Sequence, residues 1–165
     1  MKIFIFVLAV FLLFSCNKSN KSEVKNDKKE SVKKSVKKEV KEIHKPDQKE
    51  IKAQYYEVIF DFKDEINAGE DFLFNLKAVP KNHRHINTGF PVSLKFDDGC
   101  FKFEKNKFKA QDAKNLTEKE LSFNLKSKCE EKGVKKISGS LKFGYCTDEM
   151  CYTYNSPFSF KIRVK

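Results

Sequence analysis

The sequence predicts an all-β protein, an antiparallel β-sandwich preceded by a signal peptide and a disordered lysine-rich tether. Three observations lead to this prediction. The C-terminal two thirds of the chain consists of short runs in which apolar and polar residues alternate. Turn residues separate these runs, and no long stretch there has a convincing helical period. The N-terminal third is a short apolar run followed by a hydrophilic one.

The first residues have the layout of a secretory signal peptide. A lysine at position 2 precedes an apolar run over residues 3–14, and Ser15 and Cys16 follow. The run falls short of the about 20 apolar residues that a transmembrane helix needs. Residues 13–16 (LFSC) resemble a bacterial lipobox, the signature for cleavage before a cysteine that becomes lipid-modified. An ordinary signal peptide and an uncleaved anchor are the alternatives.

We therefore expect a lipoprotein signal peptide over residues 1–15 and lipidation of Cys16. The mature protein would be lipid-anchored in the bacterial cell envelope, facing the periplasm or the cell surface. Residues 16–53 would be the lipidated cysteine and a disordered basic linker, because lysine, glutamate, serine and asparagine dominate there. The chain has a formal net charge of +11. Export separates it from nucleic acid, so no nucleic-acid partner is expected.

Residues 54–165 are predicted to form one domain. Alternation of apolar and polar residues predicts strands in six runs, at residues 55–62, 72–79, 92–96, 121–125, 141–145 and 158–164. Turn signals lie at 67–69, 97–99 and 132–133. Six or seven strands in a domain of this length favour a sandwich of immunoglobulin-like size. Residues 110–119 are the one stretch that suits a helical turn.

The chain has five cysteines, and four remain if Cys16 is acylated. Four cysteines allow three connectivities. Cys146 and Cys151 are the simplest pair, because a short loop joins them. Cys100 and Cys129 would then form a structural disulfide, and the alternative is that either is a free thiol.

In an oxidising compartment, the Cys146–Cys151 pair is either a structural bridge or a redox centre. Spacing alone favours the structural bridge. A short intervening loop, polar and expected to be exposed, favours exchange with a partner thiol. The acidic Asp148 and Glu149 oppose thiolate formation, which suits a passive electron carrier more than an aggressive nucleophile.

Residues 138–151 (SGSLKFGYCTDEMC) resemble the end of the N-terminal periplasmic domain of the thiol–disulfide interchange protein DsbD. That family has a strand with a glycine and an aromatic residue, a cysteine, a short acidic loop and a second cysteine. Residues 83–92 (HRHINTGFPV) resemble an earlier turn of the family that leads into a strand. The resemblance covers residues 72–165. It implies an immunoglobulin-like sandwich with Cys146 and Cys151 as the catalytic pair.

The resemblance also implies partners. A thioredoxin-like or CcdA-like membrane reductase would reduce the pair, and oxidised extracytoplasmic thiol proteins would receive the electrons. If the protein is an enzyme, it is an oxidoreductase of the thiol–disulfide interchange type, and no cofactor is expected. The family shields its disulfide with an aromatic residue of a cap loop. The sequence does not identify that loop here, and Phe90 and Phe108 are only candidates.

Two other functions stay open. The protein would be a non-catalytic envelope lipoprotein if both disulfides are purely structural and the sandwich binds a protein or cell-envelope partner. A copper or zinc site would use soft and imidazole ligands from a set of five residues, Cys146, Met150, Cys151, His83 and His85. The cysteine spacing is not that of a zinc knuckle, so no metal site is predicted. No phosphate-binding loop or nucleophile elbow is present in the sequence.

Overall fold

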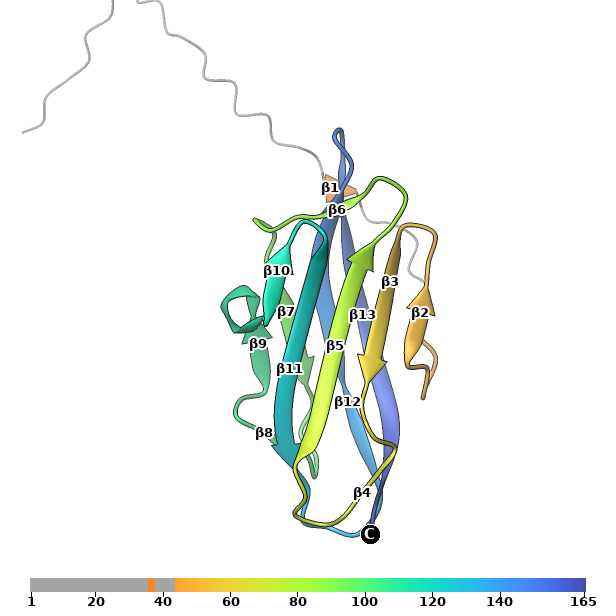
Figure 1. Ribbon diagram of the computed structural model, residues 1–165, viewed down its shortest axis with the longest axis vertical. Coiled ribbons are helices and arrows are strands. Elements are labelled where there is room, and N and C mark those ends of the chain that lie inside the picture. Colours follow the sequence, from red (N-terminus) through yellow and green to blue (C-terminus); the bar gives the residue numbers. More distant parts are fainter. Residues whose placement is uncertain (1–35, 38–43) are drawn as a thin grey trace, which may run out of the picture. The chain divides into compact units, whose positions relative to one another are not determined.

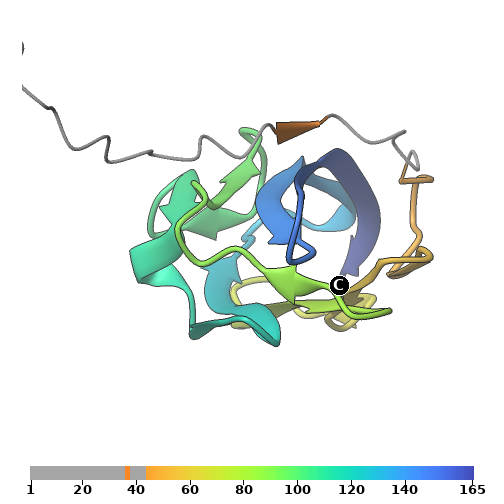
Figure 2. The same ribbon diagram turned by 90° about the horizontal axis from the view of Figure 1, so that it is seen from above.

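The computed structural model describes residues 36–37 and 44–165. The predicted signal peptide and the lipidated Cys16 lie outside the described residues. The described chain forms two β-sheets that lie face to face (Figures 1 and 2). All strand pairs are antiparallel except the pairs that β13 makes with the short strands β1 and β4. The predicted immunoglobulin-like antiparallel sandwich is therefore confirmed.

The seven-stranded sheet contains the longest strands of the described chain. Its order is β1 (Val36–Lys37), β13 (Cys151–Val164), β12 (Gly133–Cys146), β7 (Ser93–Phe96) and β9 (Lys107–Lys109). Two short strands join it at the sides, β4 (Glu65–Ile66) on β13 and β6 (His85–Ile86) on β12.

The six-stranded sheet forms the other layer, at the front in Figure 1. Its order is β10 (Asn115–Thr117), β11 (Glu120–Lys128), β5 (Phe72–Pro80), β3 (Tyr56–Asp61) and β2 (Glu50–Lys52), with β8 (Lys102–Phe103) on β11. A single 3-10 turn, η1 (Ala110–Asp112), lies within the stretch that suited a helical turn.

Each of the six alternating runs overlaps a strand, and the runs 55–62 and 92–96 extend past theirs by one residue at one or both ends. Alternation places one side chain in two against the opposite sheet. The two C-terminal strands are longer than predicted, at 14 residues each. Beyond the predicted runs, polar residues occupy the outward positions of both strands. Buried and exposed positions therefore keep alternating although these parts of the sequence are less apolar.

Phenylalanine rings fill the space between the sheets. Phe60 and Phe74 of the six-stranded sheet meet Phe158 and Phe160 of the seven-stranded sheet. The Phe60 and Phe160 ring centres lie 5.0 Å apart, in a tilted arrangement. Tilted and edge-on contacts of this kind add stability beyond the burial of apolar area. Among the described residues, no helix is both long and apolar enough to cross a bilayer.

The segment 44–53, which we expected to belong to the disordered linker, packs into the sandwich. Ile51 is buried, and its strand β2 pairs with β3. The His44 ring lies between Phe60 and Phe160, with ring centres 5.4 and 5.3 Å away. The segment is mostly polar, so its sequence did not indicate that His44 and Ile51 pack at the edge of the core. The boundary that we placed after residue 53 therefore lies N-terminal of His44.

Cys100 and Cys129 are joined by a disulfide, with Cα atoms 5.1 Å apart. Cys129 follows β11 and is fully buried, and Cys100 lies two residues before β8. This bridge is near the start of β12, whereas Cys146 is its last residue. Because 14 strand residues at about 3.4 Å each span roughly 45 Å, the two cysteine pairs lie at opposite ends of the sandwich (Figure 1).

Candidate functional site

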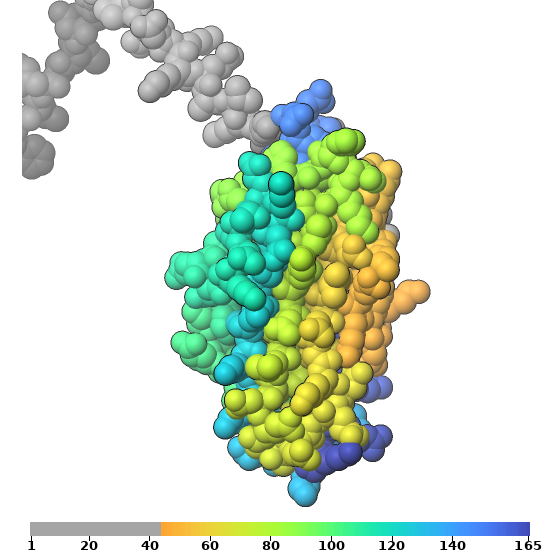
Figure 3. Space-filling view, viewed as in Figure 1, coloured from red at the N-terminus to blue at the C-terminus, as the bar shows by residue number. Residues whose placement is uncertain are grey.

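The second cysteine pair closes the hairpin formed by β12 and β13. The two strands stay in register from Gly133 opposite Val164 to Cys146 opposite Cys151. The Thr147 N–H donates to the Met150 carbonyl at 2.8 Å, and the Met150 N–H donates to Thr147 Oγ1 at 3.0 Å. These bonds close a tight loop in which Asp148 and Glu149 are exposed. The loop between β12 and β13 is the blue segment at the upper end of the molecule in Figures 1 and 3.

Cys146 and Cys151 form a disulfide across this hairpin, with Cα atoms 4.0 Å apart. The alternation along β12 decides which way the bridge points. Leu141, Phe143 and Tyr145 are buried in the core cluster between the sheets, so the even-numbered residues of β12 point away from that core. The disulfide therefore lies on the outer face of the seven-stranded sheet.

The sulfurs are nevertheless covered. Cys146 is 2% exposed and Cys151 is 6% exposed. Our expectation of a disulfide open to a partner thiolate is therefore wrong for this conformation, although the loop tip itself is exposed. Backbone of other strands flanks the hairpin on both sides. His85 of β6 lies opposite Cys146, and Val36 of β1 lies opposite Cys151.

Residues 84–90, here named the cover segment, contribute side chains as well as backbone. Asn87 donates from Nδ2 to Sγ of Cys151 at 3.6 Å, and its N–H donates to the Gly144 carbonyl at 2.9 Å. Phe90 lies against Gly144, which is two residues before Cys146 on the same outer face. A Cβ at Gly144 would come 2.5 Å from Phe90 Cγ, so only glycine leaves room for this ring.

Of the two candidate aromatic residues, only Phe90 lies beside the hairpin. Phe108 is on β9 and packs in the core, with its ring centre 6.1 Å from that of Phe96. Spacing in the sequence cannot distinguish Phe90 from Phe108, because the difference lies in the sheet: β9 pairs with β7, and two strands, β12 and β7, separate it from β13.

The cover segment is attached to the sandwich at Ile86, which is fully buried in the core. The Ile86 N–H donates to the Glu118 carbonyl in the turn between β10 and β11 at 2.7 Å, and within the segment the Phe90 N–H donates to the Asn87 carbonyl at 3.1 Å. Just before it, Asn82 and His83 have left-handed backbone, with φ of 52° and 58°. Such residues cost of order 1 kcal/mol each, so the sharp turn persists only while the packing holds it.

Arg84 places a positive charge beside the hairpin. Its guanidinium carbon lies 4.2 Å from the Tyr55 ring centre and 4.6 Å from that of Tyr152, the neighbour of Cys151. Its Nη1 atom is buried without a hydrogen-bond partner in the described part of the chain.

Sequence reasoning missed Arg84 and Asn87 as members of this site. Both lie in the stretch that carried part of the family resemblance. The contact of Asn87 with Cys151, and that of Arg84 with Tyr152, depend on the pairing of β6 with β12. The tyrosines next to the cysteines pack as strand residues. Tyr145 and Tyr154 are buried, with ring centres 5.4 and 5.1 Å from that of Tyr56.

The residues considered as metal ligands are not gathered into a site. Cys146 and Cys151 bond to each other, and His85 lies on β6 while His83 is in the preceding turn. Over residues 44–165, no three histidine, cysteine, aspartate or glutamate side chains are grouped to hold a metal ion.

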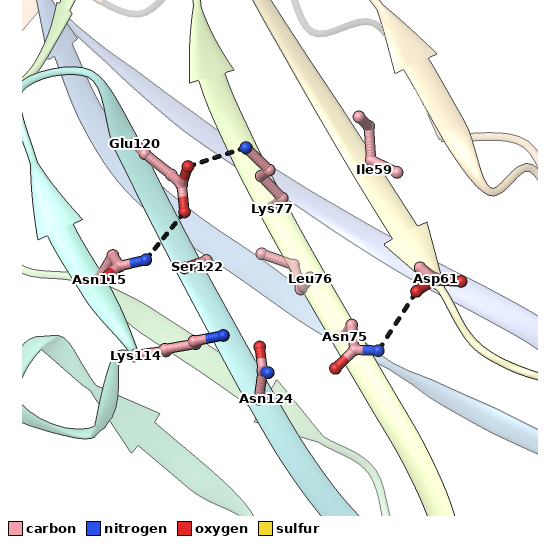
Figure 4. A pocket seen from close by; sticks show the side chains of 10 residues that line it. All are labelled: Ile59, Asp61, Asn75, Leu76, Lys77, Lys114, Asn115, Glu120, Ser122 and Asn124. Carbon is pink, nitrogen blue, oxygen red and sulfur yellow. Dashed lines mark hydrogen bonds and ion pairs between the residues drawn. The ribbon is translucent and has the colours of Figure 1, made fainter.

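A polar depression of about 310 Å³ lies on the outer face of the six-stranded sheet (Figure 4). Most of its charges are already paired. Lys77 and Glu120 form an ion pair at 2.8 Å, Asn115 donates to Glu120 at 3.1 Å, and Asn75 donates to Asp61 at 3.3 Å. The Lys77 ammonium, with Asn115 and Ser122, lowers the pKa of Glu120 to about 2. Because these groups satisfy one another, we assign the candidate site to the cysteine hairpin.

Comparison with known proteins does not identify a family. No protein-family model matches the chain, and no curated protein sequence matches it significantly. Among solved structures, the chain is similar to AggA, the major subunit of aggregative adherence fimbriae type I from Escherichia coli. The identity is 11% and the TM-score is 0.37, over 74% of this chain and 99% of that chain. A similarity of this size carries no functional argument.

Proposed function

We propose that this protein is an extracytoplasmic thiol–disulfide exchange protein that relays electrons through Cys146 and Cys151. The single observation that supports this proposal is the position of the disulfide. It points to the outer face of the sheet, and a short added segment covers it, whereas a bridge between the sheets would be enclosed by the core. Displacement of the Asn87 and Phe90 side chains would open the sulfurs while Ile86 stays in the core.

The proposed reaction is a pair of thiol–disulfide exchanges. A partner thiolate attacks Sγ of Cys146, and the Cys146–Cys151 bond breaks. Cys151 leaves as a thiolate, since the Asn87 amide donates to its sulfur. A second thiolate of the partner attacks the mixed disulfide and releases Cys146 as a thiolate. The partner leaves oxidised, and the reduced pair carries two electrons, taking up protons according to pH.

The same steps in reverse pass the electrons to an oxidised extracytoplasmic thiol protein. The resemblance to the N-terminal domain of DsbD supports a thioredoxin-like or CcdA-like membrane reductase as the electron donor. The lipobox-like motif supports anchoring through lipidated Cys16 in the cell envelope, on the periplasmic side or the cell surface. The exchange needs no cofactor, because the sulfurs carry the electrons.

The reduction potential of the Cys146–Cys151 pair tests the proposal directly. Exchange with a thioredoxin-type reductant requires a potential near the range of thioredoxins and disulfide isomerases. A potential below about −300 mV would mark an inert bridge and would contradict the proposal. The Cys100→Ala/Cys129→Ala variant, if folded, isolates the signal of this pair.

Burial of both cysteines favours a second candidate, a non-catalytic envelope lipoprotein in which both disulfides are structural. Its sandwich would bind a protein or cell-envelope partner. The Cys146→Ser/Cys151→Ser variant separates the two functions. If this variant is less stable but still binds its protein or cell-envelope partner, the structural candidate is supported. Loss of electron transfer in a folded variant supports the relay.

A further inference from the structure

A groove of about 560 Å³ lies on the outer face of the seven-stranded sheet, across β12, β7 and β9. Four lysines line it, and strand register arranges them in two rows. In one row, Ser93 lies between Lys142 and Lys109, and in the other, Lys95 lies between Ser140 and Lys107. Because adjacent strands are about 4.8 Å apart, these lysines start within roughly 10 Å of one another.

Within residues 44–165, none of the four lysines of the groove is in a salt bridge, and no residue lining the groove is acidic. The nearby Asp97 accepts from the Ser138 hydroxyl at 2.7 Å. Asp112 pairs with Lys105 and lies beside Lys109, whose backbone N–H donates to it at 2.7 Å, so Lys109 has a carboxylate close by. The depression in Figure 4 differs, because its lysine and glutamate neutralise each other.

Two further features favour a bound anion. Lys95 and Lys107 are directly opposite across the strand pair, and like charges in such positions repel. The Ser93 hydroxyl in the wall of the groove is buried and has no hydrogen-bond partner among the described residues. An anionic ligand would relieve the repulsion, and a polar ligand would satisfy the hydroxyl.

The groove adjoins the covered disulfide on one face of the same strand. Lys142 and Cys146 both point outward from β12, and four residues at about 3.4 Å place them roughly 14 Å apart. Gly144 lies between them under the Phe90 ring, and the Lys142 ammonium is 5.5 Å from that ring's centre. A chain lying in the groove would therefore end against the cover segment.

We infer that the groove is the docking surface for an acidic, extended segment of the thiol protein that exchanges with Cys146–Cys151. The inference rests on the proposed function, which supplies the reason for a protein partner. The positive charge of the groove attracts an acidic segment and speeds its association. The same charge repels basic partners and so discriminates against them. Docking beside Phe90 brings the partner's thiol to the cover segment.

Binding of a cysteine-free, glutamate-rich peptide to the full chain tests the groove itself, by fluorescence anisotropy. The Lys95→Glu/Lys142→Glu variant should weaken binding at least about tenfold. Lys136 and Lys161 provide the control, because they are exposed on the same outer face of the sheet but do not line the groove. The Lys136→Glu/Lys161→Glu variant makes the same change in net charge and should bind within about twofold of the wild type.

A second arm separates the groove from the redox chemistry. The glutamate-rich peptide with one cysteine should form a mixed disulfide with the protein at least about tenfold faster than a lysine-rich peptide of equal length, and salt should reduce the difference. Equal rates, or equal loss in both charge variants, would overturn the docking inference. Tighter binding of a heparin oligosaccharide than of the acidic peptide would overturn it in favour of a sulfated glycan.

The double variant Cys146→Ser/Cys151→Ser makes the two failures distinguishable. Peptide binding that persists in this variant, combined with no exchange in the wild type, supports the groove as an acidic-peptide site and contradicts the proposed function. Exchange in the wild type without any preference for the acidic peptide supports the proposed function and overturns the docking surface.

Discussion

Phe90 lies on Gly144, in a space that a Cβ at position 144 would occupy at 2.5 Å from Phe90 Cγ. This contact joins the cover segment to the outer face of β12, two residues from Cys146. Phe90 can therefore lie beside the disulfide only because glycine at position 144 has no side chain. The closeness of this contact makes position 144 the most direct place to open the site without altering a cysteine.

Gly144→Ala should displace Phe90 and increase the rate at which dithiothreitol reduces the Cys146–Cys151 disulfide, by several-fold or more. Forcing an extra methyl group into a packed site also costs about 1–3 kcal/mol of folding stability. Thiol trapping followed by mass spectrometry measures the rate. Gly99→Ala is the control, because a Cβ there meets only the Lys136 carbonyl at an ordinary 3.5 Å. An unchanged rate in Gly144→Ala would show that Phe90 does not limit access.

Asn87→Leu should lower the reactivity of the reduced Cys151 thiol toward iodoacetamide at neutral pH. The Asn87 amide donates to Cys151 Sγ, and a donor stabilises the thiolate more than the neutral thiol. Asn155→Leu, an exposed position on the same strand as Cys151, controls for the loss of an amide. Equal reactivity of Cys151 in the wild type and in Asn87→Leu would contradict the assigned role of this amide.

The two disulfides should contribute differently to stability. Loop lengths follow from sequence separations of 29 and 5 residues. The chain-entropy relation then gives about 3.6 kcal/mol for the Cys100–Cys129 bridge and about 2 kcal/mol for Cys146–Cys151. Urea denaturation of the two double-alanine variants measures both contributions. A larger loss for the Cys146–Cys151 pair would indicate that its cover contributes folding energy beyond loop closure.

His44 should make the protein less stable in mild acid. Burial between Phe60 and Phe160 lowers the pKa of His44 from its usual value of 6.5. Below pH 6.5 the unfolded state therefore binds a proton that the folded state resists, so stability falls as the pH drops, until the lower folded pKa is reached. Chemical denaturation at a series of pH values should show this slope in the wild type and not in His44→Phe. His83→Ala should keep the slope.

Glu120 should also make the protein less stable as the pH falls, but in stronger acid than His44 does. Lys77, Asn115 and Ser122 lower its pKa from 4.5 to about 2, so this stabilisation is complete above pH 4.5 and is lost as the pH falls toward 2. Its side chain is 26% exposed, and solvent screening limits the contribution to about 1 kcal/mol. Glu120→Gln should therefore lose about 1 kcal/mol at neutral pH and almost nothing near pH 2. A constant difference across this range would exclude the ion pair as the cause.

Alternation in the sequence was sufficient for the long strands. Phe72, Phe74 and Leu76 of β5 recur at every second position, and this local period places them together on the core side. The short strands β4 and β6 have two residues each, too few for any period. They are strands because they pair with β13 and β12, so only the folded arrangement reveals them.

The spacing of Cys146 and Cys151 by itself determined that they are able to pair, because a loop of four residues leaves their sulfurs close together whatever the rest of the chain does. Only the tertiary structure decided that Asn87 and Phe90 cover this pair and that four lysines from three strands share one groove. The physical reason is range. Periodicity and short loops act between neighbours in the chain, whereas the Asn87 amide reaches a sulfur 64 residues away through the pairing of β6 with β12.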